Sequence, residues 1–276
     1  MTVKLGIFSK TFPRSSADEL FSAVAVAGYS SVQFNLACLG ASMLPTAPVP
    51  ADLIRNVASM AAAHGVSLAA TSGTFNLIHP NRAVVEAGMR GLQCLSELCG
   101  RLEIPVITLC SGTMDPDDMW REHPDNGSAV AWTALRAAVK EALEVTAATA
   151  VRLAIEPEPA NVVNSAPRAR RLLDEIQDPR LGVTMDGANL ATARTAQENR
   201  DIFARAFELL GDRIVLAHAK DRRADGTICP AGQGIVDYPV FVAGLKAAGY
   251  SGSLIVHGIA EPDARATSDY LRKLLD

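Results

Sequence analysis

Short apolar segments alternate with longer amphipathic segments along the whole chain, and no low-complexity linker separates them. Eight of the apolar segments are strand-like over four to six residues, which is typical of the buried strands of a parallel sheet. The predicted strands begin at Val3, Ser31, Val66, Pro105, Arg152, Leu181, Arg213 and Ser253.

Each predicted strand is followed by a segment with helical periodicity. The predicted helices span residues 16–27, 52–64, 81–100, 128–150, 166–176, 197–210, 238–248 and 261–275. Ser16 and Glu19 have the spacing of a capping box, and Pro167 lies in the first turn of the fifth helix, where proline is tolerated. Glycines that follow the periodic stretches are expected to end helices, namely Gly28, Gly65, Gly100, Gly211 and Gly249.

Eight strand–helix units of about 34 residues each predict a (β/α)8 TIM barrel, a fold with a usual length of about 250 residues. A doubly wound open sheet is the main alternative. It would usually carry a glycine-rich phosphate-binding turn after the first strand, where this chain has FSKTFPRSS. We therefore predict an α/β protein with one TIM-barrel domain over residues 1–276. In such a barrel the carboxyl ends of the strands converge on one mouth, where the active site lies.

The composition favours a small-molecule ligand. The chain has 276 residues, of which 49% are hydrophobic, and a net charge of -4. No stripe of Lys and Arg alternates with aromatic residues, which argues against nucleic acid as a partner. Five cysteines without a CxxC pair argue against a disulfide framework and against a thiolate zinc site.

The N-terminus, MTVKLGIFSK, enters a strand pattern directly rather than a signal sequence. No uncharged apolar run approaches the roughly 18 residues of a membrane span. We expect a cytoplasmic protein with no membrane partner. The sequence does not exclude a homo-oligomer.

The last four predicted strands all end in residues that bind metals: Glu156, Asp186, His218 and His257. One such residue alone is more often a helix cap or a hydrogen-bonded buried histidine. Four neighbouring ends can instead surround one ion, because adjacent strands lie about 4.8 Å apart. The sequence therefore predicts one divalent metal ion. Two imidazoles with two carboxylates suit Mn, Co, Fe or Zn better than Mg, which prefers oxygen ligands.

Several motifs resemble the xylose isomerase-like superfamily of metal-dependent barrels, which act as sugar or sugar-phosphate isomerases and epimerases. These motifs are LAIEPEPAN, GVTMDGANL, VLAHAKDR with the following AGQGIVDYP, and YSGSLIVHG, all in the second half of the chain. SGTFNLIHP also resembles the loop after the third strand in some members. The resemblance implies that one divalent ion is held by Glu156, Asp186, His218 and the residue ending the eighth strand.

One position departs from the resemblance. Ketose 3-epimerases of the superfamily have a glutamate at the end of the eighth strand, as a metal ligand and as one of two opposed bases. This chain has His257 there, which puts the two-glutamate mechanism in question but not metal binding. Glu261 lies four residues further on and could substitute only if its loop folds back.

The predicted chemistry follows from the ion. A divalent metal that chelates a carbonyl oxygen and the neighbouring hydroxyl stabilises the enediolate formed when the α-carbon loses its proton. We therefore predict an isomerase or epimerase that acts on a small sugar, ketose or related polyol. The candidate bases are Glu156, by analogy with family members, and Glu158, which lies in the same proline-flanked loop. The alternative for Glu158 is a solvated loop acid.

Four further residues are candidates for the site. Lys220 could reach a substrate hydroxyl or a developing oxyanion, or form a surface ion pair. Asn189, three residues after Asp186, matches a position that touches substrate hydroxyls in related epimerases; a turn cap is the alternative. Asn76 and His79 could bind substrate from the loop after the third strand, or close that loop by local side-chain bonds.

Other functions stay open. A cyclitol dehydratase of the inosose type would use the same metal site for proton abstraction and then expel hydroxide. A catalytically inactive sugar-binding barrel is a second alternative. DNA repair enzymes of the endonuclease IV type share the barrel, but they hold three zinc ions with many histidines on a basic face. Five histidines and a negative net charge argue against that activity.

Overall fold

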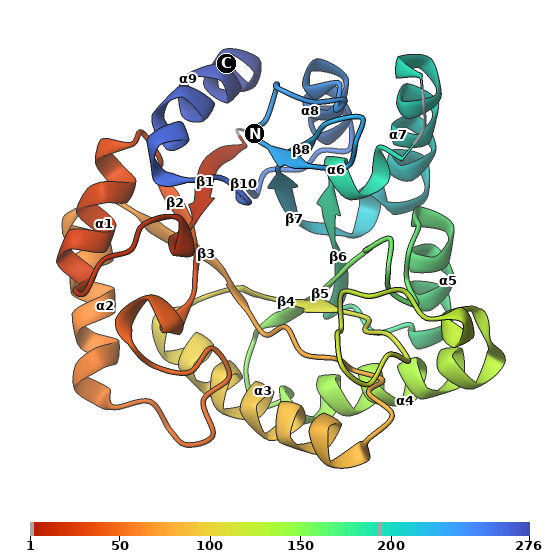
Figure 1. The fold of residues 1–276 in the computed structure, drawn as a ribbon. Coiled ribbons are helices and arrows are strands. Elements are labelled where there is room, and N and C mark those ends of the chain that lie inside the picture. Colours follow the sequence, from red (N-terminus) through yellow and green to blue (C-terminus); the bar gives the residue numbers. More distant parts are fainter. Residues whose placement is uncertain (1–2, 193–194) are drawn as a thin grey trace.

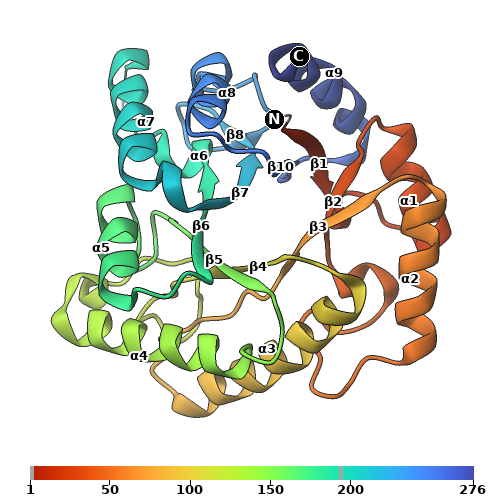
Figure 2. The ribbon, with the colours of Figure 1, turned by 180° about the vertical axis from the view of Figure 1, so that it is seen from behind.

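A computed structural model describes residues 3–192 and 195–276 of the chain. Within these residues eight parallel strands close into a barrel, in the order β1-β10-β7-β6-β5-β4-β3-β2. The longer helices surround the strands as an outer ring (Figure 1 and, from behind, Figure 2). The predicted TIM barrel is confirmed, and the doubly wound alternative is wrong.

All eight barrel strands were predicted to within about one residue at their start. They are β1 Lys4–Phe8, β2 Ser31–Phe34, β3 Ser67–Ser72, β4 Val106–Cys110, β5 Arg152–Glu156, β6 Leu181–Asp186, β7 Ile214–Ala219 and β10 Ser253–Val256. Parallel pairing places Cys110 opposite Glu156 and Asp186 opposite His218. The ends of these strands therefore lie level with one another at one end of the barrel.

The α-helices follow the strands as expected, with one short addition after β6. They are α1 Ala17–Val26, α2 Ala51–Ala63, α3 Arg82–Leu102, α4 Ala129–Val145, α5 Ala166–Ile176, α6 Gly187–Leu190, α7 Ala196–Leu210, α8 Tyr238–Ala247 and α9 Ala264–Leu275. Short 3-10 helices are η1 Ser9–Thr11, η2 Leu36–Leu39, η3 Pro124–Gly127, η4 Gly211–Arg213 and η5 Glu261–Asp263. A small antiparallel hairpin, β8 Asp221–Arg222 with β9 Ile228–Cys229, follows β7.

The predicted helix ends are partly confirmed. Ser16 caps α1 by accepting a hydrogen bond from the Glu19 N–H, but the Glu19 carboxylate accepts from the Ser16 hydroxyl, so only half of the capping box forms. Gly28, Gly65 and Gly249 adopt the left-handed backbone expected after a helix. Gly100 and Gly211 do not. The buried face of α3 continues to Leu102, so that helix runs through Gly100, and Gly211 continues into η4.

Two apolar clusters fill the molecule. The larger lies between the barrel and the helices, and the smaller is built from strand residues inside the barrel: Ala70, Val106, Ala154, Val215, Leu216 and Ile255. Side chains alternate along a strand, so Glu156 faces the same side as Ala154, and His257 the same side as Ile255. Inside the barrel, apolar side chains are therefore followed by ionisable side chains toward the carboxyl ends of the strands.

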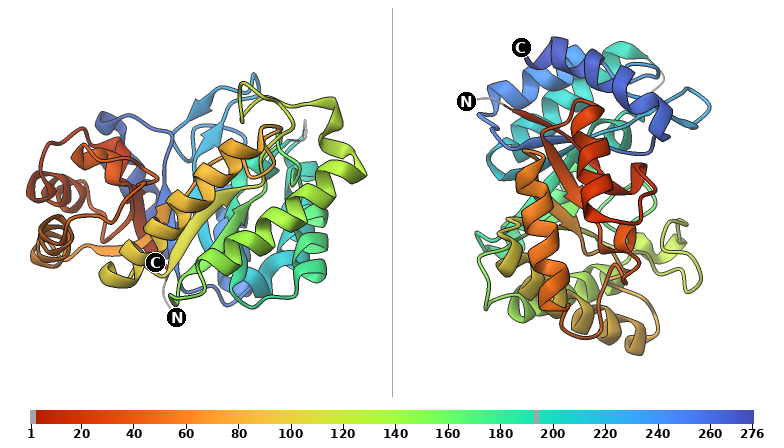
Figure 3. Two further views of the ribbon diagram at one scale, coloured as in Figure 1. Left: turned by 90° about the horizontal axis from the view of Figure 1, so that it is seen from below. Right: turned by 90° about the vertical axis from the view of Figure 1, so that its left-hand side faces the viewer.

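The loops that follow the strands form the mouth, and the start of β1 and the end of α9 lie at the opposite end of the barrel (Figure 3). No helix among the described residues combines the length and the apolar character needed to cross a bilayer.

Asp221 organises the loop after β7. The residue is fully buried. Its Oδ1 accepts hydrogen bonds from the N–H groups of Arg222 and Val236, and its Oδ2 from those of Gly232 and Gly234, at 2.8 to 3.0 Å. Gly232 has a φ of +86°, and a Cβ at Gly234 would collide with Asp221 itself. The AGQG motif thus wraps a buried carboxylate and holds the segment next to Lys220.

We expect Asp221→Ala to destabilise the protein by about 3 kcal/mol, because four loop N–H groups, that of the buried Val236 among them, lose their shared acceptor. The free energy of unfolding from urea titration measures this. Asp225→Ala, at the exposed tip of the same hairpin, is the control and should cost less than about 1 kcal/mol. Equal effects of the two substitutions would contradict the role given to Asp221.

Candidate active site

Four residues from neighbouring strand ends meet at the mouth of the barrel. Glu156, Asp186, His218 and His257 each offer one ligand-type atom, and these atoms lie within 4.8 Å of one another. His257 Nε2 is 3.1 Å from Asp186 Oδ2, and His218 Nδ1 is 3.3 Å from Glu156 Oε2. The side chains of Asp186 and Glu156 are only 0% and 8% exposed. The structure therefore brings all four predicted ligands together, in a group that could hold a metal ion.

The local fold directs each oxygen of Asp186. Asp186 ends β6 and caps α6, where its Oδ1 accepts hydrogen bonds from the N–H groups of Ala188 at 2.8 Å and Asn189 at 3.4 Å. Its Oδ2 faces His257 and lies 3.3 Å from Lys220 Nζ. One oxygen is thus used by the backbone, and the other faces the cluster.

Gln33, in β2, orients His218 from across the barrel. Gln33 Nε2 donates to Ser72 Oγ at 3.0 Å and to Thr108 Oγ1 at 3.1 Å, so its Oε1 faces His218 Nε2 at 2.8 Å. The amide oxygen can only accept, so Nε2 carries a proton, and in the neutral imidazole the lone pair is on Nδ1. Nδ1 is buried and makes no hydrogen bond within the described residues.

Glu158 and Lys220 lie beside the cluster. They line a cavity of about 510 Å³ at the mouth, together with Glu156, His218 and His257. Lys220 Nζ lies 3.8 Å from Glu158 Oε1, and the two side chains are 12% and 16% exposed. Glu158 is therefore not the solvated loop acid that was the alternative for it.

Burial and neighbouring charges shift the pKa values of two acids and the lysine. Burial acts to raise the pKa of Asp186, but Lys220 and the two imidazoles outweigh it and hold that pKa well below its usual value. Burial raises the pKa of Glu158 to about 7, and the Glu156 carboxylate adds to the effect. Burial also acts to lower the pKa of Lys220, but the carboxylates of Asp186, Glu156 and Glu158 raise it overall, so Lys220 stays charged.

The pKa values of the two imidazoles, His218 and His257, shift in opposite directions. Burial acts to lower the pKa of both. For His218 the carboxylates of Glu156 and Asp186 prevail, and its pKa is raised. For His257 burial and the nearby His218 prevail over Asp186, and its pKa is lowered. His257 is therefore a neutral donor at neutral pH.

The other predicted residues lie around the cavity rather than in it. Asn189 Nδ2 donates to Glu156 Oε1 at 2.9 Å, which places Asn189 behind that carboxylate. Asn76 Nδ2 donates to the Thr113 carbonyl at 2.8 Å, and His79 Nε2 lies 2.9 Å from the Pro116 carbonyl oxygen. Asn76 and His79 thus tie the loop after β3 to the loop after β4, and none of the three residues is among the described residues that line the cavity.

Glu261 does not join the cluster. It lies in η5 and accepts hydrogen bonds from the Arg14 guanidinium, with Arg14 Nη1 at 3.0 Å from Glu261 Oε2. The loop after β10 therefore does not fold back to bring a second carboxylate to the eighth strand end, and His257 occupies that place.

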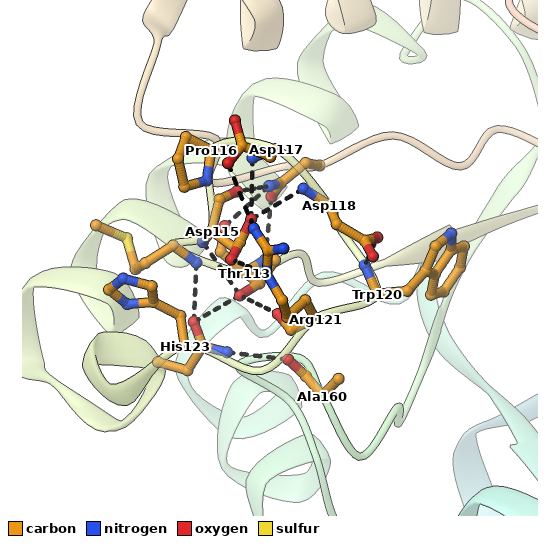
Figure 4. A network of polar contacts seen from close by, with 12 residues as sticks. Thr113, Asp115, Pro116, Asp117, Asp118, Trp120, Arg121, His123 and Ala160 are labelled. Carbon is orange, nitrogen blue, oxygen red and sulfur yellow. Dashed lines mark hydrogen bonds and ion pairs between the residues drawn. The ribbon is translucent and has the colours of Figure 1, made fainter.

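The loop after β4 forms a wall of the cavity that the sequence did not reveal. Met119 and Trp120 line the cavity, and Trp120 is exposed. Asp115 accepts hydrogen bonds from the Arg121 guanidinium at 2.6 and 2.8 Å, and from the N–H groups of the two aspartates that follow Pro116. In Figure 4 the Trp120 ring points away from this network. A polar network therefore fixes the loop and leaves the indole free beside the mouth.

Comparison with solved structures supports the fold. The 3-keto-D-glucoside 4-epimerase YcjR from E. coli is similar with a TM-score of 0.75 and 17% identity, over 98% of this chain and 99% of that chain. A D-allulose 3-epimerase from Methylomonas sp., solved with D-allulose, has a TM-score of 0.73 and 16% identity over 99% and 96% of the two chains. The IOLI protein, solved with a bound zinc atom, has a TM-score of 0.74 and 15% identity over 99% and 98%.

At these identities the similarity establishes the fold alone. No match was found among curated proteins. The family described as Xylose isomerase-like TIM barrel matches residues 21–274. Since this match spans the barrel from α1 to α9, the chain belongs to the xylose isomerase-like TIM barrel family.

Proposed function

We propose that this protein is a divalent-metal-dependent isomerase or epimerase of a small sugar, ketose or related polyol. The observation that carries the proposal is the convergence of Glu156, Asp186, His218 and His257 at the barrel mouth, with Glu158 and Lys220 beside them. The fold it shares with D-allulose 3-epimerase and 3-keto-D-glucoside 4-epimerase supports an enzyme of this kind.

The donor set fits a divalent ion. Two carboxylates would balance its charge, and Nδ1 of the neutral His218 ring would offer a buried lone pair beside Glu156. Two imidazoles favour Mn, Co, Fe or Zn over Mg. The zinc atom bound to the similarly folded IOLI protein supports the same range. An ion at this position would supply Lewis-acid polarisation of a substrate carbonyl.

Glu158 is the better candidate for the base. Glu156 Oε1 accepts from Asn189, and its Oε2 faces His218, so both of its oxygens have a structural duty. Glu158 lines the cavity near Lys220 and Asn189, and a pKa of about 7 suits a group that takes up and returns a proton near neutral pH. Two backbone hydrogen bonds to the loop 161–163 hold the Glu158 main chain in place, which limits where its carboxylate can lie in the cavity.

Lys220 complements this base. Its ammonium group remains charged between Asp186 and Glu158. From there it can donate a hydrogen bond to a substrate oxygen that gains negative charge as the neighbouring carbon loses its proton. Asn189 supports the reaction by holding Glu156 in place rather than by touching the substrate.

The metal assignment predicts that the purified protein contains about one divalent ion, in line with a single four-ligand site. Asp186→Ala and His218→Ala should each lose most of it, because each removes a ligand and leaves its partners buried and unpaired. Metal content is measured by elemental analysis. His79→Ala, a histidine outside the cluster, is the control and should retain the ion. Full retention in both ligand variants would refute the metal site.

The orientation of His218 gives a second prediction. Gln33→Leu should weaken metal binding by roughly 10- to 100-fold, because the hydrogen bond that keeps the proton on Nε2 is lost. Competition with a chromophoric chelator measures the affinity. Gln93→Leu, on the exposed side of α3, serves as the control. An unchanged affinity in Gln33→Leu would show that the amide does not set the tautomer.

The proton-transfer step gives a third prediction. If a glutamate carries the proton, deuterium from the solvent should enter the product at the α-carbon, because a carboxylate at the mouth exchanges its proton with water. Glu158→Gln should keep the ion and lose about 100-fold or more in kcat, the usual scale of general base catalysis. Glu103→Gln, at the end of α3 and outside the cavity, is the matched control.

The same incubations separate the alternatives. Ketoses, aldoses and inososes are screened, and the mass of each product is measured. A product lighter by one water would assign the dehydratase, and a metal-loaded protein without turnover would assign the inactive sugar-binding barrel. An unlabelled product together with a fully active Glu158→Gln variant would disprove proton transfer through this residue.

A further inference from the structure

The cavity at the barrel mouth has a second polar side that the proposed chemistry does not use. It is formed by residues that follow β1 and β2. Lys10, in η1, and Asn35, directly before η2, line the same cavity as His257 and Lys220. We call Lys10 and Asn35 the donor pair.

The ammonium group of Lys10 has no partner among residues 3–192 and 195–276, where it makes neither an ion pair nor a hydrogen bond. The acid at this side of the mouth is Glu261, and Arg14 already neutralises it. Lys10 also lines an adjoining cavity of about 260 Å³ with Phe8 and His257. An exposed cation, unpaired within the described residues, therefore lies beside the candidate active site.

Asn35 supplies an independent observation. Its Oδ1 accepts a hydrogen bond from the Ala37 N–H at 2.9 Å, and its backbone N–H donates to Ser9 Oγ at 2.9 Å. These bonds fix the amide, with Nδ2 as the remaining donor. Asn35 is 1% exposed, and its Nδ2 has no hydrogen-bond partner within the described part of the chain. A buried donor without an acceptor is costly, and a ligand acceptor would remove that cost.

The charges around the cavity indicate the charge of a ligand that would contact Lys10 and Asn35. Three carboxylates surround it, those of Glu156, Glu158 and Asp186, and Lys220 balances one of them. A divalent ion in the cluster would balance the other two. The charge of Lys10 then remains uncompensated, so the loaded site carries one excess positive charge.

We infer that the substrate is a sugar acid, whose carboxylate is bound by Lys10 and Asn35 while its reacting carbons face Glu158 and Lys220. The inference rests on the proposed function and names its substrate class. A carboxylate accepts hydrogen bonds from both donors and carries the single negative charge that Lys10 leaves unbalanced. A phosphate monoester carries about −1.5 to −2 at neutral pH and fits one lysine and one amide less well. No guanidinium is among the described residues that line these two cavities, and Arg14, which lines a neighbouring cavity with Lys10, is paired with Glu261.

The test compares matched ligands that differ at one carbon. Two series are used: D-glucose, D-glucuronate and D-glucose 6-phosphate; and D-fructose, D-fructuronate and D-fructose 6-phosphate. Binding to the metal-loaded protein is measured by calorimetry and by the shift in Tm, so neither readout needs turnover. We expect the carboxylate member of at least one series to bind about tenfold more tightly than its neutral counterpart, as one charge-assisted hydrogen bond would provide.

Variants assign the preference to the donor pair. Lys10→Met should abolish it, whereas Lys4→Met, an exposed lysine at the opposite end of β1, should leave it unchanged. Asn35→Asp keeps the oxygen that caps η2 but replaces the free donor with an acceptor, so it should also abolish the preference. Circular dichroism confirms that each variant is folded.

Three results would overturn the inference: no carboxylate member binds better than its neutral counterpart, the phosphate member is preferred, or the preference survives in Lys10→Met. Metal content and solvent deuterium in the product are measured on the same preparations. Failure of those two measurements counts against the proposed function, whereas loss of carboxylate preference in a metal-loaded, active protein counts against the sugar acid alone.

Discussion

The burial of three carboxylates at one end of the barrel is the constraint on which the rest of the structure depends. Asp186 is fully shielded from solvent, and Glu156 and Glu158 are nearly so. Carboxylates lose most of their hydration in such a place, and they remain charged only if cations and hydrogen-bond donors replace the water. Lys220 provides one cation, and two imidazoles provide polar neighbours. The remaining negative charge is what a divalent ion would balance.

The surrounding residues can be understood as the supports of that arrangement. Asn189 donates to Glu156, the first turn of α6 donates to Asp186, and Gln33 Oε1 accepts a hydrogen bond from His218. Each bond uses one atom of a cluster residue and leaves another facing the centre. Asp221 supports the cluster indirectly. It accepts four hydrogen bonds that hold the loop beginning at Lys220. Precise placement at the mouth therefore depends in part on residues that do not line the cavity, such as Asn189 and Asp221.

The sequence predicted the barrel and the four converging residues because both depend on local periodicity. Strand ends could be aligned without knowledge of long-range contacts, since parallel strands closed into a barrel must end together. The same reasoning could not find Gln33, which contacts a histidine 185 positions away. Its signal was a single polar residue between Val32 and Phe34 in an apolar strand. Asn76 and His79 show the reverse case: their types suit a binding site, but their bonds close one loop onto another. The β8–β9 hairpin could have been predicted from Asp225-Gly226, a common turn pair.

His257 affects both the net charge of the cluster and the number of carboxylates that could act as a base. The 3-epimerases that the sequence resembles place a glutamate at this strand end, whereas here the group is an imidazole held neutral by burial and packed near Phe8. Replacing a carboxylate with a neutral ring removes one negative charge from the cluster. In the proposed reaction it would also remove the opposed base and leave proton transfer to Glu158. With three carboxylates in place of four, Lys220 and a divalent ion would balance the cluster, and the charge of Lys10 would remain available to a ligand. Under the proposed function, the residue that limits the chemistry at the reacting carbon is therefore also the one whose missing charge would let the mouth bind an anion.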